Sequence, residues 1–225
     1  MSAHRLEVLD DLDAVHKRGT ELIAEAARAA VAERGRFELA ISGGRDPWPM
    51  FSQLEDLWDD WASTDIFQVD ERVAPAGSDE RNLTHLIESL SIGAQGSIKP
   101  MPVTDEDLDA AADRYAESLP EAIDLAHLGI GPDGHTASLV PGDPVLEVTD
   151  KRVAVTAGEY QGVRRMTLTY PEIERVRSLL WVVTGEEKVD ALRKLIDQDP
   201  STPSGRVRAG GESLILADRA AAPDL

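Results

Sequence analysis

Asp133 and His135 are the residues of this chain whose types and spacing best suit chemistry. They lie in segment 128–142, LGIGPDGHTASLVPG, where a short apolar run is stopped abruptly by glycine and proline. Such a run predicts a buried strand that ends in a loop. An imidazole close to a carboxylate suits proton transfer or general-base catalysis. A structural interpretation stays open, because Pro-Asp-Gly favours a turn and a histidine can bond within its own loop.

Two other predicted loops carry groups that could bind an anion. The loop SGGRDP at 42–47 leads into a predicted helix, and the amides of Gly43 and Gly44 together with the positive helix end suit an anion. A tight turn would explain the same glycines equally well. The loop DERVAP at 70–75 follows a second apolar run and places three charged side chains at a strand end, namely Asp70, Glu71 and Arg72.

The composition describes an ordinary globular chain with an acidic surface. Of the 225 residues, 42% are apolar and 29% are charged, and 42 acidic against 23 basic residues give a formal net charge of −19. This charge argues against nucleic acid as a partner, because phosphate backbones are bound through positive surface. An anionic small substrate would need a local basic pocket. The absence of cysteine excludes disulfides, thiolate metal ligands and a cysteine nucleophile.

The chain has neither a run of about 18 apolar residues nor a charged start followed by an apolar core, so we expect no membrane span and no signal peptide. We therefore expect a cytoplasmic protein that does not bind a membrane. Nothing in the pattern of the chain predicts an internal repeat or a linker.

Strands that alternate with helices predict a single α/β domain over residues 1–225. The expected architecture is a mostly parallel, doubly wound, Rossmann-like sheet with helices on both faces. The clearest helix spans 13–34, where apolar residues recur at helical spacing up to Gly35. The other predicted helices lie at 83–90, 106–119 and 186–196, and the predicted strands lie at 37–41, 65–69, 98–103, 124–130, 152–156, 164–170, 178–184 and 213–217.

In such a sheet the carboxyl ends of the strands share one edge, so we expect the three loops to converge there. Competing motifs are weaker. Segment 129–134 fits G-x-G-x-x-G, but the helix and the acidic residue that a dinucleotide site needs are not evident. Ser42 and Ser138 lack the Gly-x-Ser-x-Gly elbow of a serine hydrolase. The remaining histidines lack the paired spacing of a metal site.

The ordered motifs of the chain resemble those of the 6-phosphogluconolactonase family, over nearly its whole length. The DGHTASL motif is the most specific of them. Glucosamine-6-phosphate deaminase, from the same superfamily, typically has DGHIAFNEP in that loop, so residues 136–139 favour the lactonase branch. The matching segments are AISGGRDP at 40–47, DERVAP at 70–75 with Asn82 downstream, GIGPDGHTASLVPG at 129–142, RMTLT at 165–169 and VTGEEK at 183–188.

This resemblance implies hydrolysis of 6-phospho-D-glucono-1,5-lactone to 6-phosphogluconate in the oxidative pentose phosphate pathway, by a monomer, without a metal or organic cofactor. A lactone is an activated ester, so water activated by a base is sufficient. We predict that His135 is this base and that Asp133 or Asp70 orients or polarises it. The predicted phosphate ligands are Gly43, Gly44, Arg72, Arg165 and Lys188, one of which could instead meet the oxyanion.

Three positions depart from the family pattern. Asp46 stands where a Thr or Ser is usual, and its carboxylate would repel a phosphate, although Arg81 could offset that charge. Arg81-Asn82 replaces a Ser-Asn pair, and Val140 replaces a Phe before the proline of the third motif.

Two other functions remain open at this point. A deaminase of the same fold would release ammonia from glucosamine 6-phosphate. A non-catalytic sugar-phosphate sensor would bind the same ligands without turnover, but it should carry an effector or DNA-binding segment, which we do not expect here.

Overall fold

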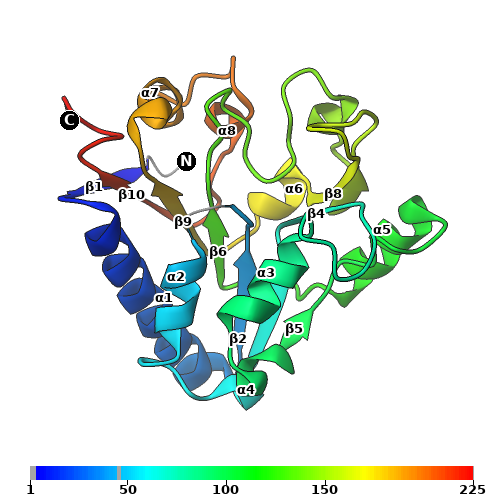
Figure 1. The fold of residues 1–225 in the computed structure, drawn as a ribbon, viewed down its shortest axis with the longest axis horizontal. Helices are drawn as coiled ribbons and strands as arrows, with labels where there is room; N and C mark the ends of the chain where they lie inside the picture. The colour runs from blue at the N-terminus through cyan, green and yellow to red at the C-terminus, as the bar shows by residue number, and fades with distance from the viewer. Residues whose placement is uncertain (1–3, 45–46, 225) are drawn as a thin grey trace.

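The computed structural model describes residues 4–44 and 47–224, and within them a parallel sheet of seven strands forms the centre (Figure 1). The strand order is β1-β10-β9-β6-β2-β3-β5, with parallel pairing throughout. From β2 the chain adds β3 and β5 on one side, and then returns to add β6, β9 and β10 on the other. The strands are β1 (Arg5–Leu9), β2 (Phe37–Ile41), β3 (Thr64–Gln68), β5 (Ile98–Lys99), β6 (Leu125–Leu128), β9 (Ser178–Val183) and β10 (Glu212–Asp218).

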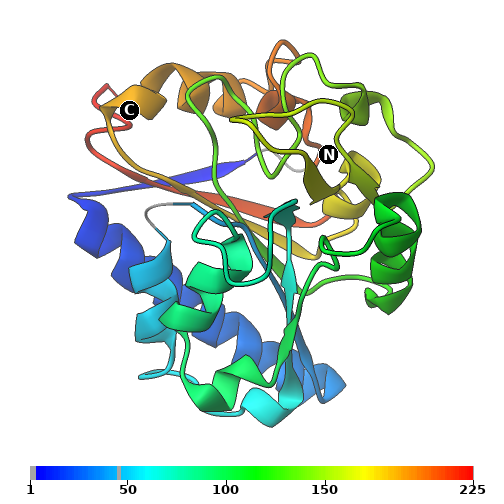
Figure 2. The same ribbon diagram turned by 45° about the vertical axis from the view of Figure 1, so that its right-hand side comes forward.

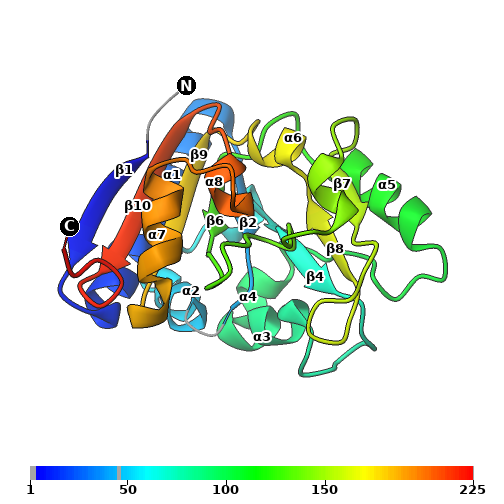
Figure 3. The same cartoon turned by 90° about the horizontal axis from the view of Figure 1, so that it is seen from above.

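Helices cover both faces of this sheet, as the sequence predicted (Figures 1 and 3). Side chains along β2 alternate between the faces, so that Leu39 and Ile41 pack in one apolar cluster and Ala40 in the other. The first cluster includes residues of α1 (Leu12–Arg34), α2 (Trp48–Leu54), α3 (Asn82–Ser89) and α4 (Ile92–Gln95). The second includes residues of α5 (Leu108–Ser118), α6 (Tyr170–Ile173) and α7 (Val189–Ile196), and α8 (Pro203–Arg206) follows α7.

The predicted first helix is confirmed, together with its end. Asp11 accepts a hydrogen bond from the amide of Ala14 at 2.9 Å and caps α1, and Gly35 ends the helix with a left-handed φ of 78°. The helices of the described part of the chain include none that is both long and apolar enough to cross a membrane. Three short 3₁₀ helices lie at η1 (Trp61–Ser63), η2 (Pro144–Glu147) and η3 (Glu186–Lys188).

A second, antiparallel sheet lies beside α5 (Figures 2 and 3), and the sequence did not predict it. Its order is β4-β8-β7, with β4 at Asp70–Arg72, β7 at Val153–Val155 and β8 at Arg165–Leu168. The predicted strands 152–156 and 164–170 therefore leave the main sheet, and the predicted loop at 70–75 begins as a strand. The reason is the short connection between β7 and β8, which can close a hairpin but not a parallel crossover.

Two further differences concern the edges of the main sheet. β1 was not predicted, because it has only five residues and the charged Arg5 and Glu7 interrupt its apolar pattern. It pairs with β10 at one edge. At the other edge, the strand predicted over 98–103 is limited to β5. Pro100 and Pro102 cannot donate backbone hydrogen bonds, so they end the ladder.

A buried ion pair joins the second sheet to the helices beside it. Glu172 of α6 is fully buried, and its two oxygens lie 2.6 and 2.9 Å from Nε and Nη2 of Arg152, which precedes β7. The same guanidinium donates to the carbonyl oxygens of Ala116, Leu119 and Pro120 at the end of α5. Arg152 therefore holds three segments together.

We expect the Arg152→Met variant to lose about 3 kcal/mol of unfolding free energy, because it leaves the buried Glu172 carboxylate without its cation. Urea denaturation at pH 7 measures this loss. Arg219→Met is the matched control, since Arg219 forms an exposed pair with Asp10 at 2.9 Å and should lose little. Equal losses in the two variants would contradict the role given to Arg152.

Candidate active site

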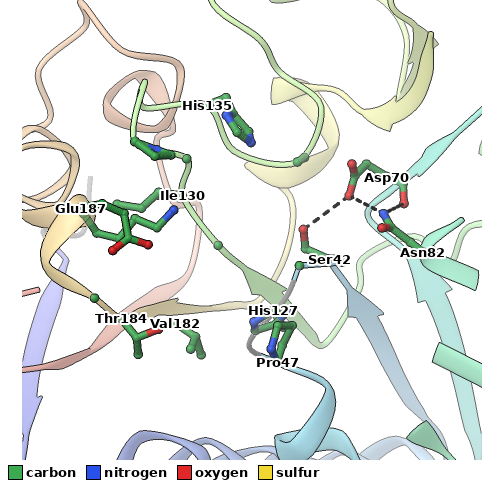
Figure 4. A pocket seen from close by; sticks show the side chains of 18 of the residues that line it. Ser42, Pro47, Asp70, Asn82, His127, Ile130, His135, Val182, Thr184 and Glu187 are labelled. Atoms are coloured by element: carbon green, nitrogen blue, oxygen red, sulfur yellow. Dashed lines mark hydrogen bonds between the residues drawn. The ribbon is translucent and has the colours of Figure 1, made fainter. Parts of the chain in front are cut away.

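The carboxyl ends of the parallel strands surround a cavity of about 600 Å³ (Figure 4). It lies where the strand order reverses between β2 and β6, which is the usual ligand position in an open α/β sheet. The loops after β2, β3, β6 and β9 all contribute to its wall, so the predicted convergence is confirmed. The cavity is lined by seven of the predicted site residues, namely Gly43, Gly44, Asp70, Arg72, His135, Arg165 and Lys188. The eighth, Asp133, is not part of the lining but contacts His135.

His135 and Asp133 form a close hydrogen-bonded pair. The imidazole Nδ1 lies 2.6 Å from Oδ1 of Asp133, and the same oxygen accepts the backbone amide of His135 at 3.1 Å. Burial acts to raise the pKa of Asp133, but the charge and hydrogen bonds of His135 outweigh it, so this pKa lies below its ordinary value. Because the ionised carboxylate requires a proton on Nδ1, neutral His135 carries its free electron pair on Nε2. The pair can therefore act as a base through Nε2.

Gly131 provides the surface on which the imidazole lies. A Cβ atom at this position would come within 2.1 Å of Nδ1 of His135, so a larger residue would displace the ring. The Gly131 amide also donates to the carbonyl of His135 at 2.8 Å. Gly131 is thus required by the position of the His135 ring. A glycine of the G-x-G-x-x-G pattern is therefore explained without a dinucleotide site.

Asp70 lies in the same cavity wall but is held by other groups. It is 4% exposed, and its carboxylate accepts hydrogen bonds from Ser138 at 2.6 Å and Ser42 at 3.4 Å (Figure 4 shows the second). Asn82 donates to its carbonyl oxygen at 3.0 Å. Within the described residues no hydrogen bond joins Asp70 to His135. Asp133 is thus the carboxylate in contact with the imidazole, and Asp70 presents a fixed negative charge elsewhere in the cavity.

Gly43 is required by the close approach of its loop to Asn82. A Cβ at position 43 would lie 2.1 Å from Oδ1 of Asn82. The glycine therefore lets the first loop rest against the side chain that supports Asp70. Asp46, which departs from the family pattern in this loop, lies outside the described residues.

Three predicted cations reach the cavity from two directions. Arg72 and Arg165 stand opposite each other on the paired strands β4 and β8. Lys188 belongs to η3 after β9, whereas β4 with Arg72 follows β3, and β6 and β2 lie between β9 and β3 in the main sheet. Figure 4 shows the same separation between Glu187, beside Lys188, and Asp70.

Arg165 is 4% exposed and donates through Nη2 to the carbonyl of Tyr160 and to Oε1 of Gln161, both at 3.2 Å. Burial lowers its pKa, and the charge of Arg72 adds to this effect, while Asp70 opposes it. Its Nε is buried and has no hydrogen-bond partner among the described residues. Arg165 therefore keeps one donor that the described groups of the protein leave unused.

Glu71 and Arg81 have a structural role instead. Glu71 is fully buried and accepts the amides of Asn82 and Leu83, at 2.8 and 2.9 Å, where α3 begins. Arg81 lies 3.0 Å from its Oε2. Arg81 is thus already paired with Glu71, which argues against the expectation that it offsets the charge of Asp46.

Tyr160 and Gln161, which line the cavity from the turn between β7 and β8, were not among the predicted site residues. The available signal was weak: an aromatic residue in the polar segment GEYQG at 158–162. No role was predicted for the hydroxyls of Ser42 and Ser138 either. No group of three or more metal-ligating side chains is found in the described ranges.

His127, at the end of β6, lies under Ser42 in the floor of the cavity (Figure 4). Its ring packs edge-on against Phe51 with the centroids 5.3 Å apart. Burial lowers the pKa of His127 to about 4; a hydrogen bond with the Ser42 backbone opposes this shift, and electrostatic repulsion from His16 adds to it. His127 is therefore neutral at pH 7.

Comparison with known proteins defines the class to which this site belongs. Residues 10–216 match the family described as glucosamine-6-phosphate isomerases/6-phosphogluconolactonase. The chain is a member of this family.

Within the family, its relatives include the 6-phosphogluconolactonases of a Nostoc species and of Mycobacterium tuberculosis. The first is 33% identical over 237 residues and the second 34% over 244, and each alignment covers 98% of both chains. The crystal structure of 6-phosphogluconolactonase from Thermotoga maritima has a TM-score of 0.86 at 26% identity and covers 96% of this chain and 99% of its own. A monomeric glucosamine-6-phosphate deaminase, 18% identical with a TM-score of 0.84, shares the fold.

The low pKa of His127 predicts a specific loss of stability in acid. Below pH 6.5 the unfolded chain binds a proton at His127 that the folded chain accepts only near pH 4. The free energy of unfolding therefore decreases as the pH is lowered from 6.5 to about 4. Between pH 7 and pH 5 the unmodified protein should lose about 2 kcal/mol more than His127→Gln. Urea denaturation at both pH values measures the difference.

His85→Gln serves as the control, because His85 lies on the surface of α3 with 36% of its side chain exposed, and this variant should follow the unmodified protein. If His127→Gln lost as much stability in acid as the unmodified protein, the buried neutral state assigned to His127 would be wrong.

Proposed function

We propose that this chain hydrolyses 6-phospho-D-glucono-1,5-lactone to 6-phospho-D-gluconate, a step of the oxidative pentose phosphate pathway. The observation that carries the proposal is the Asp133–His135 pair, which leaves Nε2 of His135 as the basic nitrogen. His135 lines a cavity together with Arg72, Arg165 and Lys188. A base combined with cationic side chains suits attack of water on an anionic lactone. Relatives that match over nearly the whole chain carry the name 6-phosphogluconolactonase.

In the proposed reaction, Nε2 of His135 removes a proton from water as the water oxygen attacks C1 of the lactone. The tetrahedral intermediate then collapses with cleavage of the bond between C1 and the ring oxygen. The ring oxygen takes the proton back from Nε2 and becomes the 5-hydroxyl group, while C1 becomes a carboxylic acid that ionises in water. The base is restored at each turnover.

Asp133 supports this cycle by keeping the proton on Nδ1 and by stabilising the imidazolium that forms during attack. Its short contact with Nδ1 and its lowered pKa support this role, because the carboxylate stays ionised. We propose that Asp70 acts on the substrate from another part of the cavity. Ser138 and Ser42 fix its oxygens, so its remaining acceptor capacity can orient a sugar hydroxyl group.

For the phosphate we propose Arg72, Arg165 and Lys188 together with the amides of Gly43 and Gly44. Arg72 and Arg165 lie close enough for their charges to oppose each other, and a dianion between them would relieve this repulsion. The unpartnered Nε of Arg165 supplies one donor. The three cations are balanced by the carboxylates of Asp70, Glu187 and Asp218 in the same lining, so the cavity is less acidic than a chain whose formal net charge is −19.

We further propose that the protein acts as a single-domain, cytoplasmic monomer that does not bind nucleic acid. The net charge of −19 supports the last point. The monomer follows from the family resemblance, and one sheet whose two faces carry the two apolar clusters supports a single domain.

His135→Asn should reduce the hydrolysis of freshly generated 6-phosphogluconolactone at least about a hundredfold, because the variant lacks the base. The rate is measured above the spontaneous background, and circular dichroism checks that the fold is intact. His85→Asn, on the surface of α3, is the control and should keep full activity. Near-normal turnover by His135→Asn would refute the assignment, and ammonia release from glucosamine 6-phosphate would place the chain in the deaminase branch instead.

Lys188→Met should raise KM for the phosphorylated lactone about tenfold or more, because one charge-assisted contact to the phosphate is lost. Hydrolysis of unphosphorylated gluconolactone, which is expected to be a poor substrate, should change little. Lys194→Met, on the exposed surface of α7, is the matched control. If both lactones lost activity equally in Lys188→Met, Lys188 would act on the lactone group rather than on the phosphate.

A further inference from the structure

The turn between β7 and β8 places Tyr160 directly against the proposed base. The turn is closed by a hydrogen bond from the Tyr160 amide to the carbonyl of Val163 at 3.0 Å. Gln161 and Gly162 adopt left-handed φ values of 55° and 86° at its tip. The rings of Tyr160 and His135 meet edge to face with centroids 5.1 Å apart. A residue far from the histidine loop in sequence thus completes its surroundings.

The Tyr160 hydroxyl engages the side of Asp133 that His135 leaves free. It donates to Oδ2 of Asp133 at 3.2 Å and lies 3.4 Å from Nδ1 of His135. Oδ1 of the same carboxylate accepts hydrogen bonds from Nδ1 of the His135 ring and from the His135 backbone amide. The two oxygens of Asp133 therefore have separate partners, and this division fixes the rotation of the carboxylate.

Tyr160 also supports a cation of the cavity. The guanidinium carbon of Arg165 lies over its ring at 5.0 Å from the centroid, and Nη2 of Arg165 donates to its carbonyl oxygen at 3.2 Å. One residue thus contacts both members of the proposed catalytic pair and one proposed phosphate ligand.

We propose that Tyr160 is a positioning residue of the lactone hydrolysis, which holds His135 in its Nδ1–H form through Asp133 and keeps Arg165 in place through its ring. The inference rests on the proposed function. Burial and then the negative charge of Asp133 raise the pKa of Tyr160, so the hydroxyl stays protonated and remains a donor. Removal of this donor frees Asp133 to rotate, and His135 then loses the partner that selects its tautomer.

Tyr160→Phe tests the hydroxyl alone, because the ring and its contact with Arg165 remain. The variant should lower kcat about tenfold and leave KM within about twofold, since one hydrogen bond to a charged group is lost and the cation stays in place. Tyr160→Leu removes the ring as well, so we expect it to raise KM in addition. Tyr170→Phe is the control: its hydroxyl donates to the carbonyl of Pro203 at 2.9 Å, and the residue does not line the cavity.

A second measurement reads the position of the proton directly. The chain has five histidines, and nitrogen-15 NMR at pH 8 distinguishes their tautomers, with His135 assigned from the signals missing in His135→Asn. We expect Nδ1–H for His135 in the unmodified protein and in Tyr170→Phe, and a mixture of tautomers in Tyr160→Phe. An unchanged kcat, or a reduced kcat with His135 still purely Nδ1–H, would overturn the proposal.

The NMR measurement needs no substrate, so it separates the two claims. If the protein failed to hydrolyse the lactone but Tyr160→Phe still changed the tautomer of His135, the proposed function would be wrong and the positioning role would stand.

Discussion

β2 and β6 lie side by side in the sheet, but the chain that follows them leaves toward opposite faces. After β2 it enters α2, whose residues pack in one apolar cluster. After β6 it passes through the histidine loop, η2, β7 and β8 before it reaches α6, whose residues pack in the other cluster. The cavity lies in the gap between these two exits. The loops that carry Gly43, Gly44 and His135 start from these two strand ends, so their meeting depends on this reversal. Within the gap, the bond between His135 and Asp133 then decides which ring nitrogen is basic.

Charged side chains are held differently in the interior and at the cavity. Glu71 and Glu172 are fully buried and have arginine partners, which is the condition under which buried carboxylates are tolerated. The cations that face the cavity are held mainly by neutral groups. Arg72 donates to the carbonyl of Glu80, and Arg165 donates to the carbonyl of Tyr160. Neutral partners orient a guanidinium without cancelling its charge, so these arginines stay available to an anion in an otherwise acidic protein.

The sequence predicted the parallel sheet, the helices on both faces and the meeting of the loops, because these follow from apolar periodicity and from the geometry of crossovers. It predicted β7 and β8 as strands but placed them in the main sheet, and it predicted a loop where β4 begins, because an apolar run does not reveal its pairing partner. Residue type also could not separate Arg72, which reaches the cavity, from Arg81, which pairs with Glu71. Tyr160 was missed because its contact with Asp133 spans 27 positions of the chain and depends on the unpredicted hairpin.

A crystal structure of the protein with the product 6-phosphogluconate would test His135 as the base, since it locates both ends of the ligand against named atoms. We expect the C1 carboxylate within hydrogen-bond reach of Nε2 of His135, about 3 Å, with Nδ1 still bonded to Asp133. We also expect the phosphate to lie among the cavity cations and the amides of Gly43 and Gly44. A C1 carboxylate remote from His135, with the imidazole bonded to the phosphate instead, would contradict the assignment of His135 as the base.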